Sequence, residues 1–322
     1  MVSLLVTVAV EPDTPGGEVQ ARTSLRNLEG AARFQRLAER FGVRPTWLLP
    51  YPALSDGRTE WFGDLWASER AEIGAHLQPW ITPPFEANED RLVARPPSAI
   101  PASAVEAKLR TLTDAIERTL GRRPRAHRAA GHGLNGAALQ ALERLDYAVD
   151  SSVTPFVAAD AAGAPDWRAA PEAPYFPDRQ QPQLRGSSPV LEVPLTVGWD
   201  RPLPGVVARA LTRCGPTLER VVQTPWLPTP RLRWLDPCRS DAGALRTLAE
   251  TAIERGLPCL TLNLRSPALW PGESAECPDA AKVDKVFERV DGFLRFAIDE
   301  LRATPRTLSG FAAHYLNETG CV

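Results

Sequence analysis

The sequence predicts an α/β protein built as a single parallel barrel, and three observations support this prediction. Short strand-like runs alternate with amphipathic helical patterns almost from end to end of the chain, as in parallel sheets whose strands are joined by helices. The length of 322 residues fits one barrel of this kind with inserted loops. Three proline-rich stretches, 79–102, 155–189 and 215–237, interrupt the alternation without separating two self-sufficient halves. We therefore expect one domain over residues 1–322, with these stretches as loops above one end of the barrel.

The first three strands and the first helix follow from apolar runs near the N-terminus. Residues 4–10 form a short apolar run typical of a buried strand. Residues 28–41 have helical periodicity, and Gly42 is placed to end that helix. Residues 46–49 and 72–76 are the second and third expected strands.

A longer helix is predicted after the first proline-rich stretch. Ser103 is expected to cap it, with Glu106 three residues on completing a capping box. Gly121 is expected to end it. Its apolar stripe at helical spacing consists of Val105, Leu109, Leu112, Ile116 and Leu120.

The same alternation continues through the rest of the chain. Further strands are expected at 126–130, 147–151, 190–195 and 259–264. Further helices are expected at 135–145, 242–255 and 281–301. Strands separated by helices pair in parallel, which completes the predicted barrel.

Bulk properties restrict the class of partner. Hydrophobic residues make up 43% of the chain and charged residues 24%, close to globular averages. The formal net charge of -2 gives no reason to expect nucleic acid or an anionic membrane surface as a partner. No apolar run approaches the roughly 20 residues needed to span a bilayer. We therefore expect neither nucleic acid nor membrane among the partners.

The N-terminus and the cysteines predict a cytoplasmic protein. The segment MVSLLVTVAVEPD has no basic residues before its apolar run, and acidic residues follow at once, which fits a first strand better than a signal peptide. The cysteines are odd in number without C-x-x-C spacing, so free thiols in a reducing compartment are the simplest interpretation. They are Cys214, Cys238, Cys259, Cys277 and Cys321.

Six segments of the chain carry motif-like residues. They are VTVAVEPD (6–13), FGVRPTWLLPYPAL (41–54), EIGAHLQPWITPP (72–84), HRAAGHGLNGAALQALERLDYAVDSSVTP (127–155), LEVPLTVGW (191–199) and LTLNLRSPALWPGES (260–274). Together, and in the expected chain order, they resemble the motifs of polysaccharide deacetylases, the NodB-homology family of carbohydrate esterases. The resemblance covers nearly the whole chain. It implies a distorted (β/α)7 barrel with its groove at the C-terminal ends of the strands.

The resemblance also implies an activity, the removal of an N-acetyl or O-acetyl group from a sugar or glycan precursor. In that family a divalent, zinc-like metal held by one carboxylate and two histidines binds water and polarises the carbonyl group. An aspartate acts as base and a histidine as acid. The partner implied is a carbohydrate or another small-molecule substrate.

Three positions depart from the pattern that the resemblance implies. Ala9 stands where the first motif has its aspartate, and alanine can neither bind metal nor take a proton. The second metal histidine is missing: Gln78 stands where it is often placed, two residues after His76, and Trp80 holds the alternative position four residues after it. A neutral amide is a poor ligand for zinc-like ions. Arg265 stands at the position of the acidic histidine and cannot usefully donate a proton at neutral pH. His76 matches the first metal histidine, so any metal site would be weak and centred on His76 and Glu11.

The catalytic candidates are the charged residues of the matched motifs. Glu11 and Asp13 share one strand face with position 9 and can partly replace its carboxylate. Arg128 matches the arginine that orients the catalytic carboxylate in the family, and Arg265 adds a second cation to the groove. Each has a structural alternative. Glu11 can form an ion pair with Arg128 or Arg265, and Asp13 can be a turn residue.

The substrate-binding candidates are Trp80, His127, His132 and Asp150. Trp80 is placed to stack on a sugar. The two histidines flank a glycine-rich turn after a strand, where they line the groove or support it. Asp150 belongs to the D-S-S-V strand of the resemblance. His76, too, can simply hydrogen bond to a backbone carbonyl.

Three functions remain open at this level. The first is a deacetylase or related C–N hydrolase with a weakened metal site. The second is a non-hydrolytic protein that binds a carbohydrate or a partner enzyme. The third is a metal-independent enzyme in which Arg128 and Arg265 hold an anionic substrate. The sequence leaves the substrate and the oligomeric state open.

Overall fold

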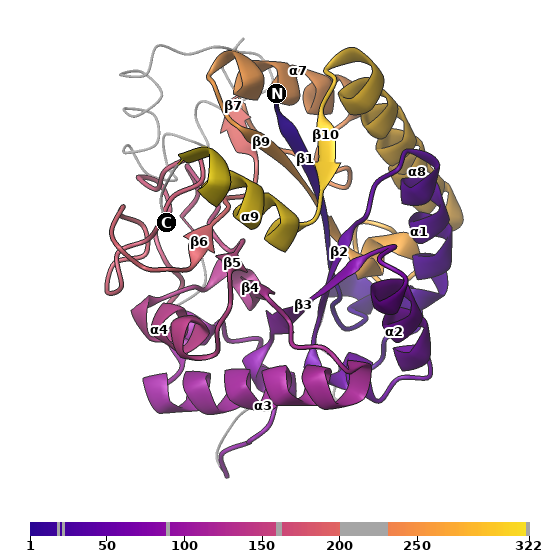
Figure 1. Cartoon of the computed structure of the whole chain (residues 1–322). Coiled ribbons are helices and arrows are strands. Elements are labelled where there is room, and N and C mark those ends of the chain that lie inside the picture. Colours follow the sequence, from indigo (N-terminus) through magenta and orange to yellow (C-terminus); the bar gives the residue numbers. More distant parts are fainter. Residues whose placement is uncertain (18–19, 21–22, 88–90, 159–162, 200–230, 320–322) are drawn as a thin grey trace.

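The fold is a distorted parallel barrel surrounded by helices, seen in a computed structural model that describes residues 1–17, 20, 23–87, 91–158, 163–199 and 231–319 (Figure 1). Seven strands follow one another in the order β9 (Cys259–Arg265), β1 (Ser3–Ala9), β2 (Thr46–Leu49), β3 (Glu72–Leu77), β4 (Ala126–Ala129), β5 (Val149–Asp150) and β6 (Leu191–Glu192). All neighbours in this order pair in parallel. The predicted distorted (β/α)7 barrel is confirmed.

The barrel is completed by irregular backbone between β6 and β9. The Leu235 N–H donates to the Thr196 carbonyl, and the Asn263 N–H donates to the Leu235 carbonyl, both at 2.9 Å. Beside this segment a short antiparallel pair forms from β7 (Val197–Trp199) and β8 (Leu232–Trp234). Most of the third proline-rich stretch, residues 215–230, lies outside the described residues.

Helices cover the outer face of the barrel, and their apolar stripes form the larger hydrophobic core. They are α1 (Ala31–Arg40), α2 (Thr59–Ala67), α3 (Ala102–Leu120), α4 (Gly136–Arg144), α7 (Ala242–Glu254) and α8 (Ala280–Arg295). A π-helical turn, Phe296–Glu300, continues α8. Gly121 ends α3 with a φ of 75°, as predicted. The capping box at Ser103 was wrong, because α3 begins at Ala102 after Pro101 and has no side-chain cap.

The N-terminal end of the barrel is closed by a helix that the sequence pattern did not reveal. Strand β10 (Thr304–Arg306) pairs with the first half of β1, and α9 (Leu308–Thr319) follows it. The Thr46 hydroxyl accepts from the Leu308 N–H at 3.1 Å and donates to the buried Glu72 carboxylate at 2.8 Å. An apolar cluster that includes Leu5 and Phe311 fills the space between α9 and the strands. The opposite, C-terminal end of the strands is left to the loops.

Strand register decides which polar residues face the interior of the barrel. Ala9 pairs with Arg265, and His76 pairs with Arg128. Because side chains alternate along a strand, the residues next to them point outward into the helical layer. Among the described residues, no helix is both long and apolar enough to cross a membrane.

Candidate functional site

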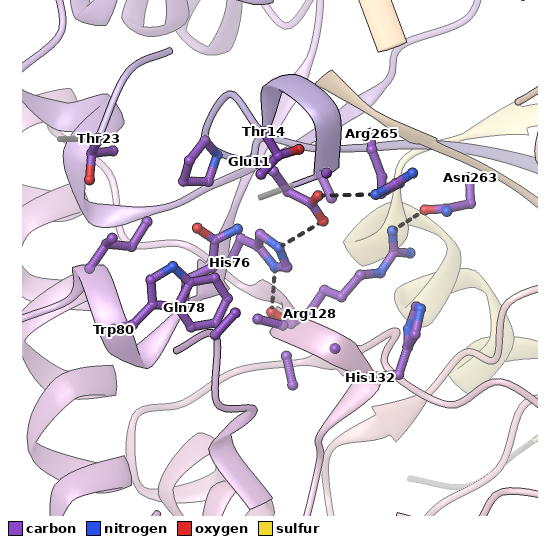
Figure 2. Close-up of a pocket in the computed structure, with 18 of the residues that line it drawn as sticks. Glu11, Thr14, Thr23, His76, Gln78, Trp80, Arg128, His132, Asn263 and Arg265 are labelled. Atoms are coloured by element: carbon purple, nitrogen blue, oxygen red, sulfur yellow. Dashed lines mark hydrogen bonds and ion pairs between the residues drawn. The ribbon is translucent and has the colours of Figure 1, made fainter. Parts of the chain in front are cut away.

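A cavity of about 450 Å³ lies at the C-terminal end of the strands, where the loops after β1, β3, β4 and β9 meet (Figure 2). Its charged and polar lining comes mainly from Glu11, Thr14, Thr23, His76, Gln78, Arg128, His132, Arg239, Asn263, Arg265 and Glu276. Trp80, Ala9 and small residues of the turn after β4 supply apolar surface. Four of the six matched segments, 6–13, 72–84, 127–155 and 260–274, thus converge on one pocket.

Glu11 lies between a histidine and an arginine. Its Oε1 is 3.7 Å from His76 Nε2, and its Oε2 is 3.7 Å from Arg265 Nη1 (Figure 2). Burial raises the pKa of Glu11, but its interactions with His76 and Arg265 outweigh burial and hold the pKa below the ordinary value. Glu11 is therefore ionised at neutral pH and is a weak base.

The orientation of His76 is fixed from below. Its Nδ1 lies 3.0 Å from the backbone carbonyl of Arg128, and a carbonyl only accepts, so Nδ1 carries the proton. In the neutral ring Nε2 then holds a lone pair. This atom is buried without a hydrogen-bond partner and faces the Glu11 carboxylate. Two acceptors facing each other in this way favour a hydrogen-bond donor supplied by a ligand.

A resident zinc-type ion does not fit the residues present. In the part of the chain that the structure describes, no three His, Cys, Asp or Glu side chains are grouped to hold a metal. The Gln78 amide oxygen is buried and without a partner, but a neutral amide is a poor ligand for such ions. The positive charge of Arg265 beside Glu11 also opposes a cation at the same place.

Arg128 is a buried cation whose hydrogen bonds, among the described residues, all go to neutral acceptors. Its Nε donates to the Ser151 carbonyl at 2.6 Å, and its Nη2 donates to the Ser151 hydroxyl at 2.9 Å. Its Nη1 donates to the Asn263 side-chain oxygen at 2.6 Å. The residue is 2% exposed, and burial lowers the pKa of its guanidinium to about 10. Arg128 is therefore still charged at neutral pH.

Arg265 is engaged by two carboxylates. Its Nη2 is 2.5 Å from Glu276 Oε1, and its Nη1 is the atom that faces Glu11. Burial alone would lower the pKa of Arg265, but the nearby carboxylates outweigh burial and hold the pKa above its ordinary value. The arginine expected in the groove is present there, and it holds its proton throughout the neutral range.

His132 and Trp80 line the pocket as the sequence predicted. His132 has a φ of 57°, and its carbonyl accepts from Trp167 Nε1 at 2.9 Å, which fixes the turn. Burial, with the charges of Arg128 and Arg239, lowers its pKa to about 3, so the ring is neutral. Trp80 also lines a neighbouring cavity of about 200 Å³, so its ring lies between two hollows.

Asp13 is a loop-organising residue and does not line the pocket. Its carboxylate accepts from the Ser24 hydroxyl at 2.5 Å and from the Arg26 N–H at 2.7 Å. It also accepts from the Asn27 N–H at 3.0 Å and the Asn27 side-chain amide at 2.5 Å. With its oxygens used in this way and 3% exposure, the expectation that Asp13 acts in catalysis is corrected to a turn role.

His127 and Asp150 lie on the other side of the barrel wall. They are adjacent in strand register, their Nδ1 and Oδ1 atoms are 2.6 Å apart, and both side chains are 0% exposed. Arg128 occupies the inner face, so its neighbour His127 must point outward into the helical layer. The expectation that these two residues contact a substrate is corrected, because neither side chain reaches the pocket.

The sequence interpretation missed Asn263, Arg239 and Glu276. Asn263 lies two residues before Arg265 on β9, so strand alternation would have placed both on the inner face. Arg239 and Glu276 lie on irregular loops, where no periodic signal indicates which side chains turn toward the pocket.

Comparisons with known proteins support the fold. No protein-family model matches the chain, and no curated protein matches its sequence. A structure named as a polysaccharide deacetylase from Mycobacterium smegmatis is 15% identical, with a TM-score of 0.55 over 99% of this chain and 91% of its own. A glycoside hydrolase/deacetylase, so named, from Parabacteroides distasonis is 16% identical, with a TM-score of 0.65 over 98% and 71%. The chain thus shares the fold of the family that its motifs resemble.

Proposed function

We propose that the protein binds a carbohydrate in this pocket and does not hydrolyse it. The observation that carries the proposal is the pairing of Arg265 with two carboxylates. It pairs with both Glu11 and Glu276 at the place where the family resemblance implies a proton donor. It therefore occupies a carboxylate that a metal or a catalytic water would need.

The proton chemistry of the pocket argues against amide cleavage. Hydrolysis of an amide needs an activated water and an acid that protonates the departing nitrogen. Arg265 cannot act as that acid, and His132 is neutral at pH 7 with a pKa of about 3. Glu11, with its lowered pKa, is a weak base. Arg265, His132 and Glu11 therefore do not supply a matched acid and base.

The shape and lining of the pocket suit a sugar. Its volume of about 450 Å³ lies within the roughly 300–1,000 Å³ of typical small-molecule sites. Trp80 offers a flat apolar ring near Gln78 (Figure 2), and Thr14 adds a polar side chain to the same pocket. Sugar rings have apolar C–H faces and polar rims, which such a lining can contact at once.

The test combines a binding measurement with an activity measurement on the same protein. Chitooligosaccharides and their mono-N-acetyl sugar are titrated by calorimetry, and acetate release is followed with and without added zinc. We expect binding without acetate release. Trp80→Ala should weaken binding about five- to tenfold, and Trp80→Phe, which keeps a ring, should weaken it less.

A hydrolase with a weakly held metal is the alternative outcome of this experiment. Three acceptor groups of the pocket support this alternative, since they could contact a metal ion. They are His76 Nε2 and the Gln78 side-chain oxygen, both without a hydrogen-bond partner, and the Glu11 carboxylate. Zinc-dependent acetate release that disappears in Glu11→Gln would overturn the proposal in favour of that hydrolase. Absence of saccharide binding, unchanged by Trp80→Ala, would remove the carbohydrate assignment itself.

A further inference from the structure

Resting on the proposed function, we infer that Arg128 binds an oxyanion of the ligand, so that the preferred saccharide carries a carboxylate or phosphate group. The first step concerns the unspent hydrogen bonds of Arg128. A guanidinium has five N–H donors, and three of them are used on Ser151 and Asn263. Of the remaining two, one belongs to Nη1 and one to Nη2. Two donors on adjacent nitrogens match the paired oxygens of a carboxylate or phosphate.

The second step concerns charge. Among the described residues, no carboxylate pairs directly with Arg128, and all three of its acceptors are neutral. A buried cation without a counter-ion in contact is costly. More distant carboxylates favour its charge, but burial still has the largest effect on its pKa. An anion supplied by a ligand would therefore gain more here than at an exposed arginine.

The third step excludes the nearby carboxylates as partners. Glu11 is held by His76 and Arg265, and Glu276 is held by Arg265. Asp236 Oδ2 faces Arg239 at 4.0 Å and also accepts from the Asn263 amide at 3.3 Å. The other two arginines of the pocket thus have carboxylates of their own.

The fourth step concerns access. Arg128 and Ala9 line the same cavity, and both lie on inner-face positions of the barrel. The small side chain at position 9 leaves the space between the strand ends open to a ligand group. A carboxylate built at that position would fill this space and could neutralise Arg128 from within the protein. Position 9 therefore offers a direct competitor for the ligand oxyanion.

The experiment uses one neutral sugar, two anionic derivatives of it, and two protein variants whose new side chains have the same size. N-acetylglucosamine, N-acetylmuramic acid and N-acetylglucosamine 6-phosphate are titrated by calorimetry against the full chain at low and high salt. Ala9→Asp introduces the competing carboxylate, and Ala9→Asn introduces the same shape without charge. Circular dichroism and a melting curve establish that both variants fold.

We expect at least one anionic sugar to bind about tenfold more tightly than the neutral one, with the advantage reduced by salt. Ala9→Asp should remove that advantage, and Ala9→Asn should retain most of it. The carboxylate and phosphate arms show which oxyanion is preferred.

The outcomes separate this inference from the proposed function. Equal affinity for neutral and anionic sugars, unaltered by Ala9→Asp, would overturn the inference and leave carbohydrate binding intact. A second outcome is that no sugar binds, that inorganic phosphate or acetate does bind, and that Ala9→Asp abolishes this anion binding whereas Ala9→Asn does not. In that case the oxyanion site stands and the carbohydrate proposal fails. Anion binding that survives Ala9→Asp would place the anion elsewhere and overturn the inference.

Discussion

Two histidine–carboxylate clusters lie on opposite faces of the same barrel wall. The inner cluster, at the pocket, joins His76 on β3 to Glu11 and, through it, to Arg265 (Figure 2). The outer cluster, under the helices, joins His127 on β4 to Asp150 on β5. The closest histidine–carboxylate approach is 3.7 Å in the inner cluster and 2.6 Å in the outer one.

The outer cluster is fully buried and its hydrogen bonds are short, although His127 Nε2 and Glu192 Oε2 have no partner among the described residues. Asp150 accepts from His127, from the Ser152 hydroxyl and from the Ser152 N–H, each within 3.0 Å. Glu192, next in register, accepts from the Val153 N–H at 3.0 Å. Burial and the neighbouring Asp150 raise the pKa of Glu192 well above its ordinary value. Burial also raises the pKa of Asp150, but the hydrogen bonds that Asp150 accepts outweigh burial and lower its pKa. Of the two neighbouring carboxyl groups, Asp150 is therefore the ionised one and Glu192 the protonated one.

The inner cluster is loose and faces a cavity. Its ion pairs are at 3.7 Å, and His76 Nε2 has no hydrogen-bond partner. Perturbed pKa values occur in both clusters, so perturbation alone does not mark a functional site. Buried polar atoms without a hydrogen-bond partner occur in both clusters as well. What distinguishes the inner cluster is that its unpartnered His76 Nε2 borders a cavity large enough for a ligand. The comparison predicts that the outer residues matter for stability and the inner ones for binding.

The largest expected effect is on stability, from changing the outer cluster. Asp150→Asn places an amide N–H or a weaker acceptor against His127, so a fully buried hydrogen bond is lost. We expect the free energy of unfolding to fall by about 3 kcal/mol, measured by denaturant titration. Glu11→Gln, the matched change in the inner cluster, should cost less than about 1 kcal/mol because solvent screens its pairs. Equal losses in the two variants would show that the clusters do not differ as argued.

A smaller effect is expected in the pH dependence of stability. Folded Glu192 keeps its proton above the ordinary glutamate pKa of 4.5, whereas the unfolded chain releases it. The native state then binds more protons, so stability falls as pH rises from about 4.5 toward the folded pKa. Each unit of this window is worth about 1.4 kcal/mol.

Glu192→Gln cannot titrate, so its stability should fall less than that of the wild type between pH 5 and pH 7, in unfolding curves at both values. Glu11→Gln is the control. The folded pKa of Glu11 is lowered, so its contribution is present above the unfolded pKa and is lost only as pH falls through the folded pKa. Its slope over the same window should match that of the wild type. If the unfolding free energy of Glu192→Gln changed with pH as steeply as that of the wild type, Glu192 would have to be ionised in the folded protein.

The sequence predicted the barrel well because its buried strands are compact apolar runs. It did not reveal β10 or α9, since Thr304–Arg306 is a three-residue strand with a central proline and no alternation. It also mistook Ser103 for a cap, because the chain enters α3 from Pro101 and Ser103 already lies inside the helix. These are failures of local pattern where tertiary contacts decide the structure.

The candidate site was predicted at the level of motifs and only partly at the level of residues. Glu11, His76, Arg128 and Arg265 were brought together because parallel strands end at one edge of a barrel. His127 was placed in the groove wrongly, because adjacent residues on a strand face opposite ways and only register decides which faces inward. Asp13 belongs to a matched motif, but both of its carboxylate oxygens accept hydrogen bonds from its own loop. Spacing alone cannot separate these cases.

The smallest expected effect comes from the rim of the inner cluster. Glu276 is 42% exposed at its side chain and pairs with Arg265 at 2.5 Å. An ion pair in contact with solvent contributes little to stability, so Glu276→Gln should change the free energy of unfolding by less than about 0.5 kcal/mol.

The same substitution should strengthen the binding of an anionic sugar. Removal of one carboxylate leaves Arg265 with Glu11 alone and makes the pocket more positive, so N-acetylmuramic acid should bind about two- to threefold more tightly at low salt, with N-acetylglucosamine unchanged. Glu288→Gln, on α8, is the matched control for an exposed charge outside the pocket lining. If both variants tighten binding equally, the gain reflects net charge alone. If Glu276→Gln destabilises the protein as much as Asp150→Asn does, the rim is part of the structural framework and the contrast between the two clusters is lost.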